Sequence, residues 1–256
     1  MRKPLVAGNW KMHGSLASAT ELAAAIAANS AEYTATEVLL VPPSVHIGSV
    51  ANAVAASQVA VGGQNLCQQA GQGAYTGEVS GEMLKDLACR YVLVGHSERR
   101  ALYGESDETV AEKAAVARSQ GLTPIICIGE TEAEREEDQT EAVIAKQLAA
   151  VLNSVSNAEF EGSVIAYEPV WAIGTGKTAS PEQAQQVHAQ IRAALANKSE
   201  ALAQSTRILY GGSVKAASAA ELFQQPDIDG GLVGGASLDA NEFTAIIKAA
   251  NERISA

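Results

Sequence analysis

Short apolar runs alternate along the whole chain with longer segments of mixed polarity. The runs are nearly continuous in apolar residues, which is typical of parallel strands buried on both faces, whereas the longer segments have the polar, alanine-rich character of helices. The predicted strands lie at 4–10, 37–42, 58–63, 89–95, 122–129, 163–168, 207–212 and 228–235. Eight strand–helix units in 256 residues fit a closed (β/α)8 barrel better than an open doubly wound sheet. We therefore expect an α/β fold with a single barrel domain spanning residues 1–256.

Local signals mark where several helices begin. At each of three predicted helix starts there is a pair of residues three positions apart. The side chain of each residue in a pair can accept a hydrogen bond from the other's backbone N–H. These pairs are Thr131 with Glu134, Ser180 with Gln183, and Asp239 with Glu242. From the first of them, one continuous helix is predicted to run to about Leu152.

Composition and charge narrow the class of protein. The 29 acidic and 18 basic residues give a net charge of −11, which argues against nucleic acid or an anionic membrane as a partner. The first residues, MRKPLVAGNW, contain no apolar region of signal-peptide length, and no apolar run approaches the roughly 20 residues of a membrane span. Cys67, Cys89 and Cys127 form no CxxC pair, so free thiols are expected. We expect a cytoplasmic protein.

The stretch YEPVWAIGTGKT, at 167–178, joins a strand to a carboxylate and then to a mobile segment. Glu168 ends an apolar strand, and Pro169 biases it away from helical geometry, which fixes the direction of the carboxylate. The next four residues are apolar yet lead into Gly174 and Gly176, as in a lid that swings and excludes water from a polar site. An ordinary strand–helix connection with a salt-bridging glutamate is the alternative.

Polar side chains follow two other strands. Asn9 and Lys11 lie at the end of the first predicted strand, and His96, Ser97 and Glu98 lie at the end of the fourth. In a barrel, the residues after each strand gather at one end, so these side chains should converge with the carboxylate at 168. Because only one histidine, His96, follows a strand in this way, no metal site is expected.

Each of these residues also has an ordinary structural interpretation. Lys11 could be a solvated lysine, His96 a hydrogen-bonded core residue, and Glu98 an ion-pair partner of Arg99 or Arg100. These alternatives are reasonable one at a time. Jointly, on the same barrel rim, the residues favour a catalytic site.

The seventh and eighth strands end in small residues, Gly211-Gly212-Ser213 and Gly234-Gly235-Ala236-Ser237. Glycines there let backbone N–H groups approach an anion, and a short helix starting at Gly235 would add the positive end of its dipole. Barrels frequently bind phosphate at this position. Simple tight turns are the alternative.

Several familiar motifs are incomplete. GTGKT at 174–178 lacks the first glycine of a P-loop, since position 171 is Trp171, and GHSER at 95–99 lacks the last glycine of a nucleophile elbow. The segment around Gly71 and Gly73 lacks the third glycine of a dinucleotide-binding turn. Cys127 could be a nucleophile, but its isoleucine neighbours favour a buried structural role.

Seven motifs together resemble those of the triosephosphate isomerase family. They are AGNWKMHGS at 7–15, VGHSERR at 94–100, GESDE at 104–108, IICIGE at 125–130, YEPVWAIGTGKT at 167–178, YGGSV at 210–214 and LVGGASL at 232–238. They occur in order from end to end of the chain. The resemblance implies interconversion of dihydroxyacetone phosphate and glyceraldehyde 3-phosphate through an enediolate, in glycolysis and gluconeogenesis, with no cofactor.

The resemblance also implies a role for each residue. Glu168 would be the base, His96 a neutral electrophile kept uncharged by the helix that Ser97 and Glu98 begin, and Lys11 the source of positive charge. Asn9 would orient the substrate. The N–H groups that bind phosphate would come from Gly174, Ser213, Gly234 and Gly235.

The segment at 64–80 is longer than most barrel connections need. In the family such a loop docks beside the active site of a second subunit, which implies a homodimer with Thr76 near the partner subunit's Asn9 and the partner subunit's Lys11. Two rival interpretations are a Schiff-base aldolase, which would need a lysine within a strand, and an inactive barrel kept as a scaffold.

Overall fold

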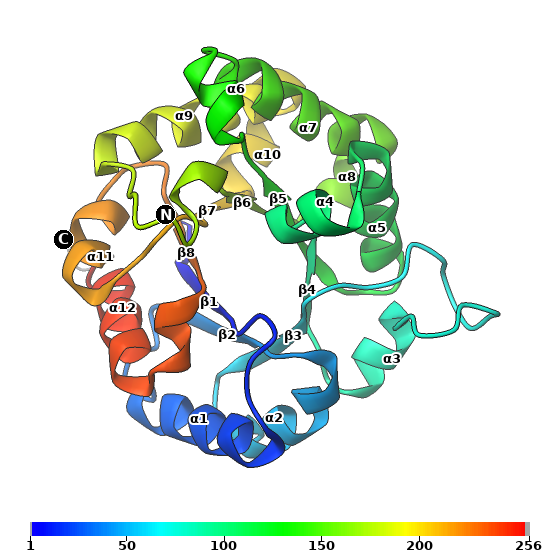
Figure 1. Ribbon diagram of the computed structural model, residues 1–256, viewed down its shortest axis with the longest axis vertical. Coiled ribbons are helices and arrows are strands. Elements are labelled where there is room, and N and C mark those ends of the chain that lie inside the picture. Colours follow the sequence, from blue (N-terminus) through cyan, green and yellow to red (C-terminus); the bar gives the residue numbers. More distant parts are fainter. Residues whose placement is uncertain (1, 254–256) are drawn as a thin grey trace.

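The computed structural model describes residues 2–253, and its eight parallel strands close into a barrel (Figure 1). The strands follow one another around the barrel in chain order, and the last pairs with the first. They are β1 (Leu5–Asn9), β2 (Glu37–Val41), β3 (Ala60–Gly63), β4 (Tyr91–Val94), β5 (Thr123–Ile128), β6 (Val164–Tyr167), β7 (Arg207–Tyr210) and β8 (Gly230–Val233). The predicted (β/α)8 fold is confirmed.

Helices surround the barrel. The α-helices are α1 (Leu16–Asn29), α2 (Ile47–Val54), α3 (Gly81–Asp86), α4 (Ser97–Tyr103), α5 (Asp107–Ser119), α6 (Glu132–Glu136), α7 (Thr140–Ser154), α8 (Asn157–Phe160), α9 (Pro181–Lys198), α10 (Glu200–Ser205), α11 (Ala216–Phe223) and α12 (Ala240–Glu252). Short 3-10 turns are η1 (Ser44–His46), η2 (Val170–Ala172) and η3 (Gly235–Leu238). Within residues 2–253, no helix combines the length and apolarity that crossing a bilayer requires.

The strands are apolar throughout because both of their faces are buried. Alternate residues such as Leu5 and Ala7 pack with other strand residues inside the barrel. The residue between them, Val6, packs in the larger apolar layer that also contains Ile26 of α1 and Phe243 of α12. The core therefore has two layers, which explains the absence of an alternating pattern in the sequence.

The helix starts follow the sequence signals in part. The reciprocal caps of Thr131 with Glu134 and of Ser180 with Gln183 both form. The single helix expected up to Leu152 is wrong, because the chain breaks between α6 and α7. Asp138 has φ 55 there, in a run of acidic residues with no glycine or proline to mark the break.

The third predicted pair forms only half of its contacts. Asp239 caps α12, since its Oδ1 accepts hydrogen bonds from the N–H groups of Asn241 and Glu242, both at 2.9 Å. The Glu242 side chain does not return to Asp239. Its Oε1 accepts instead from the N–H of Ala216, at the start of α11, at 2.8 Å.

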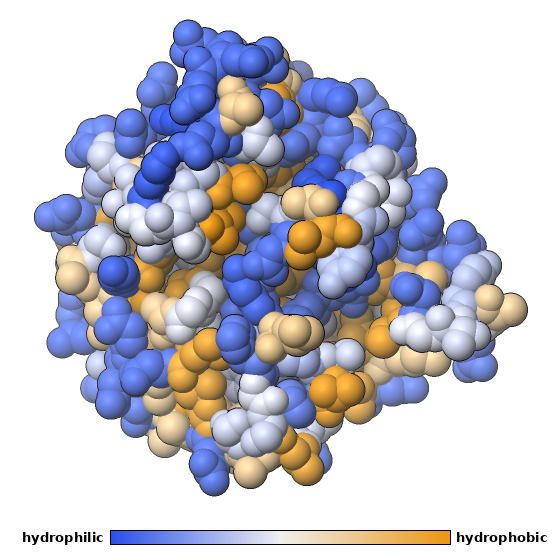
Figure 2. All heavy atoms as spheres, viewed as in Figure 1, coloured by the Kyte–Doolittle hydropathy of each residue, from blue (hydrophilic) through white to orange (hydrophobic). Residues whose placement is uncertain are grey.

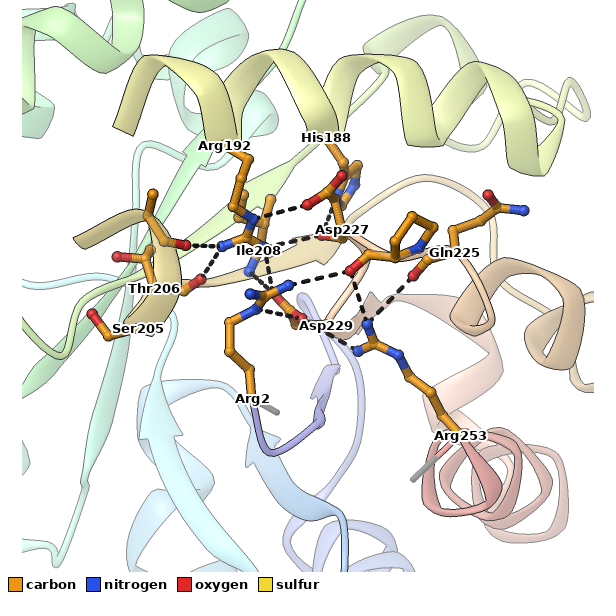
Figure 3. A network of polar contacts seen from close by, with 12 residues as sticks. Arg2, His188, Arg192, Ser205, Thr206, Ile208, Gln225, Asp227, Asp229 and Arg253 are labelled. Carbon is orange, nitrogen blue, oxygen red and sulfur yellow. Dashed lines mark hydrogen bonds and ion pairs between the residues drawn. The ribbon is translucent and has the colours of Figure 1, made fainter. Parts of the chain in front are cut away.

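A polar network closes the barrel at the amino ends of the strands (Figure 3). Asp229, which precedes β8 and is fully buried, accepts hydrogen bonds from the guanidinium groups of Arg2, Arg192 and Arg253. Arg192 also binds the carboxylate of Asp227 at 3.0 Å. The network joins the segments before β1 and β8 to α9 and to the end of α12.

Candidate active site

The carboxyl ends of the strands surround a cavity of about 550 Å³. Figure 2 looks onto this rim and shows hydrophilic side chains near the barrel centre, with apolar side chains on the loops around them. The cavity is lined by every residue predicted to act in catalysis or to bind substrate, namely Asn9, Lys11, His96, Glu168, Gly174, Ser213, Gly234 and Gly235. Residues far apart in the chain thus share one site.

Glu168 lies at the end of β6 and is 2% exposed. Its Oε2 accepts the N–H of Ser97 at 2.9 Å, and its Oε1 lies 3.0 Å from Nε2 of His96. Burial alone raises the pKa of the Glu168 carboxyl. The contacts with His96 and the Ser97 N–H outweigh burial and lower this pKa below its usual range.

His96 is positioned by the start of α4. Its Nδ1 accepts the N–H of Glu98 at 3.2 Å, which leaves the ring proton on Nε2, facing Glu168. Burial and this N–H favour the neutral ring. The carboxylate of Glu168 acts in the opposite direction and raises the pKa of His96 above its usual value while the two side chains stay in contact.

Lys11 has an unusual backbone conformation just after β1, with φ 50. Oδ1 of Asn9 accepts the Lys11 N–H at 3.0 Å, and the amide of Gln64 donates to the Lys11 carbonyl at 2.8 Å and to that of Val41 at 3.0 Å. Such a φ is unfavourable for a residue with a Cβ, so these bonds maintain it. Gln64 was not among the predicted site residues, although it directly follows β3.

Glu98 pairs with Lys11, whose Nζ lies 2.5 Å from Oε1 of Glu98. The alternative partners do not bind it, because Arg99 pairs with Glu105 and Arg100 pairs with Asp107. Glu98 therefore links the lysine of the site to α4.

The loop after β7 needs its glycines for close packing, whereas the loop after β8 is open. A Cβ at Gly211 would lie 2.8 Å from Cγ of Glu168, and one at Gly212 would lie 2.3 Å from the hydroxyl oxygen of Tyr210. Beyond Gly234, η3 begins at Gly235, as predicted, and no atom lies within 4 Å of a Cβ placed there. The backbone of this second loop is thus open to the cavity, which suits an anion.

The predicted lid is anchored at one end and open at its tip. Nε1–H of Trp171 donates to Oε1 of the fully buried Glu130 at 2.9 Å, and the guanidinium of Arg135 lies 4.6 Å from the ring centroid of Trp171. Gly174 and Gly176 are exposed and have φ 69 and 82. Glu130 was not predicted as part of the site, although it ends the motif IICIGE.

Thr76 lies apart from the cavity, in the exposed loop at 64–80. Among residues 2–253, no three His, Cys, Asp or Glu side chains gather as metal ligands would. No strand in this described part of the chain carries a lysine, so the strand lysine that a Schiff-base aldolase requires is missing there. Cys67, Cys89 and Cys127 are buried and unpaired with one another.

The chain is similar to known proteins over almost its whole length. The family model described as triosephosphate isomerase matches residues 4–250. A triosephosphate isomerase of Thiobacillus denitrificans is 58% identical over 250 residues, which cover 98% of this chain and 99% of the relative. A triosephosphate isomerase of Hydrogenovibrio crunogenus is 53% identical over 253 residues, covering 99% of this chain and 100% of the relative.

Proposed function

The chain belongs to the triosephosphate isomerase family, and we propose that Glu168, His96 and Lys11 carry out its reaction. The protein interconverts dihydroxyacetone phosphate and D-glyceraldehyde 3-phosphate, an aldose–ketose isomerisation in glycolysis and gluconeogenesis, and members of the family need no cofactor. The reaction moves a proton between adjacent carbons through an enediolate, so it requires a base and a group that stabilises the oxygens.

Glu168 is the base. In the conformation described, His96 and the Ser97 N–H lower the pKa of its carboxyl, so it is a weak base while it stays in contact with them. A substrate that draws the carboxylate away from these groups, under a closed lid that excludes water, raises this pKa. Glu168 therefore becomes a stronger base when the substrate is bound.

His96 is the electrophile at the substrate oxygens. Its Nδ1 already accepts the Glu98 N–H, so Nε2–H is the free donor. Once Glu168 turns to the substrate, the cause of the raised His96 pKa is removed, and burial favours the neutral ring. A glutamate base with a neutral histidine is the established division of roles in the family.

Lys11 and the two glycine loops bind the charged parts of the substrate. Lys11 lines the cavity and supplies positive charge to the developing oxyanion, while Asn9 orients the substrate. N–H groups at Ser213, Gly234 and Gly235 hold the phosphate. Together these N–H groups form a phosphate cradle. Closure of the lid adds the N–H of Gly174 to the cradle and protects the enediolate from water.

We also propose a homodimer, in which Thr76 docks beside the partner subunit's Asn9 and the partner subunit's Lys11. The loop at 64–80, which projects from the barrel after β3 (Figure 1), supports this proposal. Large apolar side chains are exposed after each of the neighbouring strands β1 to β4, which is typical of a surface that a second subunit covers. These side chains are Met12, Val45, Tyr75, Leu102 and Tyr103.

Three further proposals concern the protein as a whole. Closure of the barrel supports one domain over residues 1–256. The net charge of −11 supports a protein without nucleic-acid or membrane partners. The free cysteines support a cytoplasmic location.

The proximity of Glu168 and His96 in one cavity carries the proposed mechanism. Isomerisation of dihydroxyacetone phosphate in D2O tests it, because a base that exchanges its proton with solvent returns deuterium to the neighbouring carbon. NMR should show deuterium at C2 of glyceraldehyde 3-phosphate. A product that stays free of deuterium through to equilibrium would indicate direct hydride transfer and contradict the mechanism.

A further inference from the structure

The start of α11 is capped only in part from within the helix, where Oγ of Ser218 accepts the N–H of Lys215 at 3.4 Å. Its N-cap residue is Lys215, whose side chain carries only N–H donors and cannot accept a hydrogen bond. The first N–H groups of a helix need acceptors from outside the helix. The N–H of Ala216 finds one in the Glu242 carboxylate, at 2.8 Å.

Glu242 belongs to a different helix and is free to make this contact. Asp239 alone caps the start of α12, so the Glu242 side chain is not needed there. The helices α11 and α12 pack against each other (Figure 1), and the carboxylate of one meets the positive end of the other. The contact therefore joins two helix starts that are distant in sequence.

Each of these helices continues directly from one half of the phosphate cradle. The segment Gly211–Ser213 leads into α11 through Val214 and Lys215. On the other side, Gly234 and η3 lead into α12. Ser213, Gly235 and Glu242 line the same cavity. The hydrogen bond from Ala216 to Glu242 is thus a direct side-chain link between the two halves.

We propose that Glu242 is a positioning residue for phosphate binding, which sets the distance between the Ser213 loop and the N–H groups of Gly234 and Gly235. The inference rests on the proposed function of this cradle as the phosphate site. Glu242 acts through α11 and does not itself bind the phosphate. The positive end of α11 also offsets the negative charge that Glu242 brings to an anion site.

The test compares variants by steady-state kinetics, with inorganic phosphate as a competitive inhibitor. Glu242→Ala removes a charge-assisted hydrogen bond, so KM for dihydroxyacetone phosphate and Ki for phosphate should both rise about five- to tenfold. The value of kcat should change much less. Glu242→Gln keeps an acceptor oxygen and should restore both constants to within about twofold of wild type, since position rather than charge matters.

Glu252→Ala is the matched control, because Glu252 lies on the same helix, is exposed and pairs with Lys248. Its KM and Ki should equal those of wild type. Should Glu242→Ala fail to fold, Glu242→Asp replaces it, since the shorter side chain draws the carboxylate back from Ala216, and the same rise in Ki is expected.

Two results would overturn the inference: an unchanged Ki in the folded Ala or Asp variant, or a Gln variant as weak as Ala. Either result leaves the proposed function intact, provided that phosphate inhibits the wild type competitively. A wild type that phosphate does not inhibit would instead contradict the phosphate site itself.

Discussion

In the conformation described, Nε2 of His96 lies 3.0 Å from Oε1 of Glu168, and both side chains are buried. The contact raises the pKa of His96 and lowers that of Glu168, so each residue stabilises the charged form of the other. The chemistry requires the reverse, a stronger base and a neutral electrophile. Separation of the pair by substrate is therefore the step that prepares the site.

Gly174→Pro should impair the lid. Gly174 has φ 69, whereas proline fixes φ near −65°, so the substitution is incompatible with the observed turn. With the lid unable to close properly, water reaches the enediolate, and loss of inorganic phosphate should rise relative to isomerisation. The measurement is the ratio of released phosphate to isomerised product.

Gly162→Pro is the control for backbone strain. Gly162 has φ 83 and lies before β6, at the opposite rim from the lid. This variant should lose stability but keep the wild-type product ratio. An unchanged ratio in Gly174→Pro would remove the lid from the mechanism.

Thr76→Arg should disrupt the proposed dimer. Thr76 is exposed in the loop at 64–80, and a charged, bulky side chain there would oppose docking. Size-exclusion chromatography should show a monomer, and kcat should fall about a hundredfold if the partner loop preorganises Lys11. Ala158→Arg, at an exposed position of α8, should stay dimeric and active. A fully active wild-type monomer would contradict the proposal.

Asp229→Ala should destabilise the fold without changing the site. It leaves three guanidinium groups without their buried carboxylate (Figure 3), and loss of one partner of a buried pair costs about 3–5 kcal/mol of unfolding free energy. Urea unfolding measures this loss, with the exposed Glu252→Ala as a control expected to change stability by less than about 0.5 kcal/mol. KM should be unaltered, and a large rise in KM would show that this network also shapes the active site.

His188 should make the protein less stable in mild acid. Burial lowers the pKa of this histidine from 6.5 to about 4, so the native state keeps it neutral. Below pH 6.5 His188 is protonated in the unfolded chain but stays neutral in the native state. Its contribution to stability is complete above pH 6.5 and falls by about 3 kcal/mol as the pH drops to about 4.

Urea unfolding of wild type and His188→Gln, at one protein concentration and several pH values, isolates this effect from the carboxylates. The stability difference between the two proteins should change across the range from pH 6.5 to about 4 and become constant below it. A difference that is independent of pH would show that His188 does not titrate as its burial requires.

The barrel and the main site residues could be predicted because both depend on local order in the chain. Continuous apolar runs indicate strands buried on both faces, and barrel topology brings whatever follows them to one rim. Asn9 ends β1, whereas Lys11, His96 and Glu168 each come just after a strand, and all four line one cavity. Their pairing was not predictable, since the partner of Glu98 proved to be Lys11.

The remaining features depend on contacts between distant segments. Glu242 follows the sequence pattern of a local cap for α12. Its carboxylate instead accepts the N–H of Ala216 in α11, whose N-cap residue Lys215 offers no acceptor. Gln64 matters only because β1 and β3 flank β2 in the barrel, so its amide reaches Lys11 and Val41. The break at Asp138 carries no glycine or proline, so the sequence pattern continues through it.

The central claim is that this chain isomerises triose phosphates with Glu168 as the base. A coupled assay in both directions, run on wild type, Glu168→Gln and Glu168→Asp at equal concentrations, tests it most directly. Glu168→Gln removes the base and should abolish nearly all turnover, while Glu168→Asp retracts the carboxylate by one methylene and should lower kcat about a hundredfold. Wild-type turnover in a folded Glu168→Gln variant would show that another group is the base, and no turnover by the folded wild type would favour the inactive scaffold.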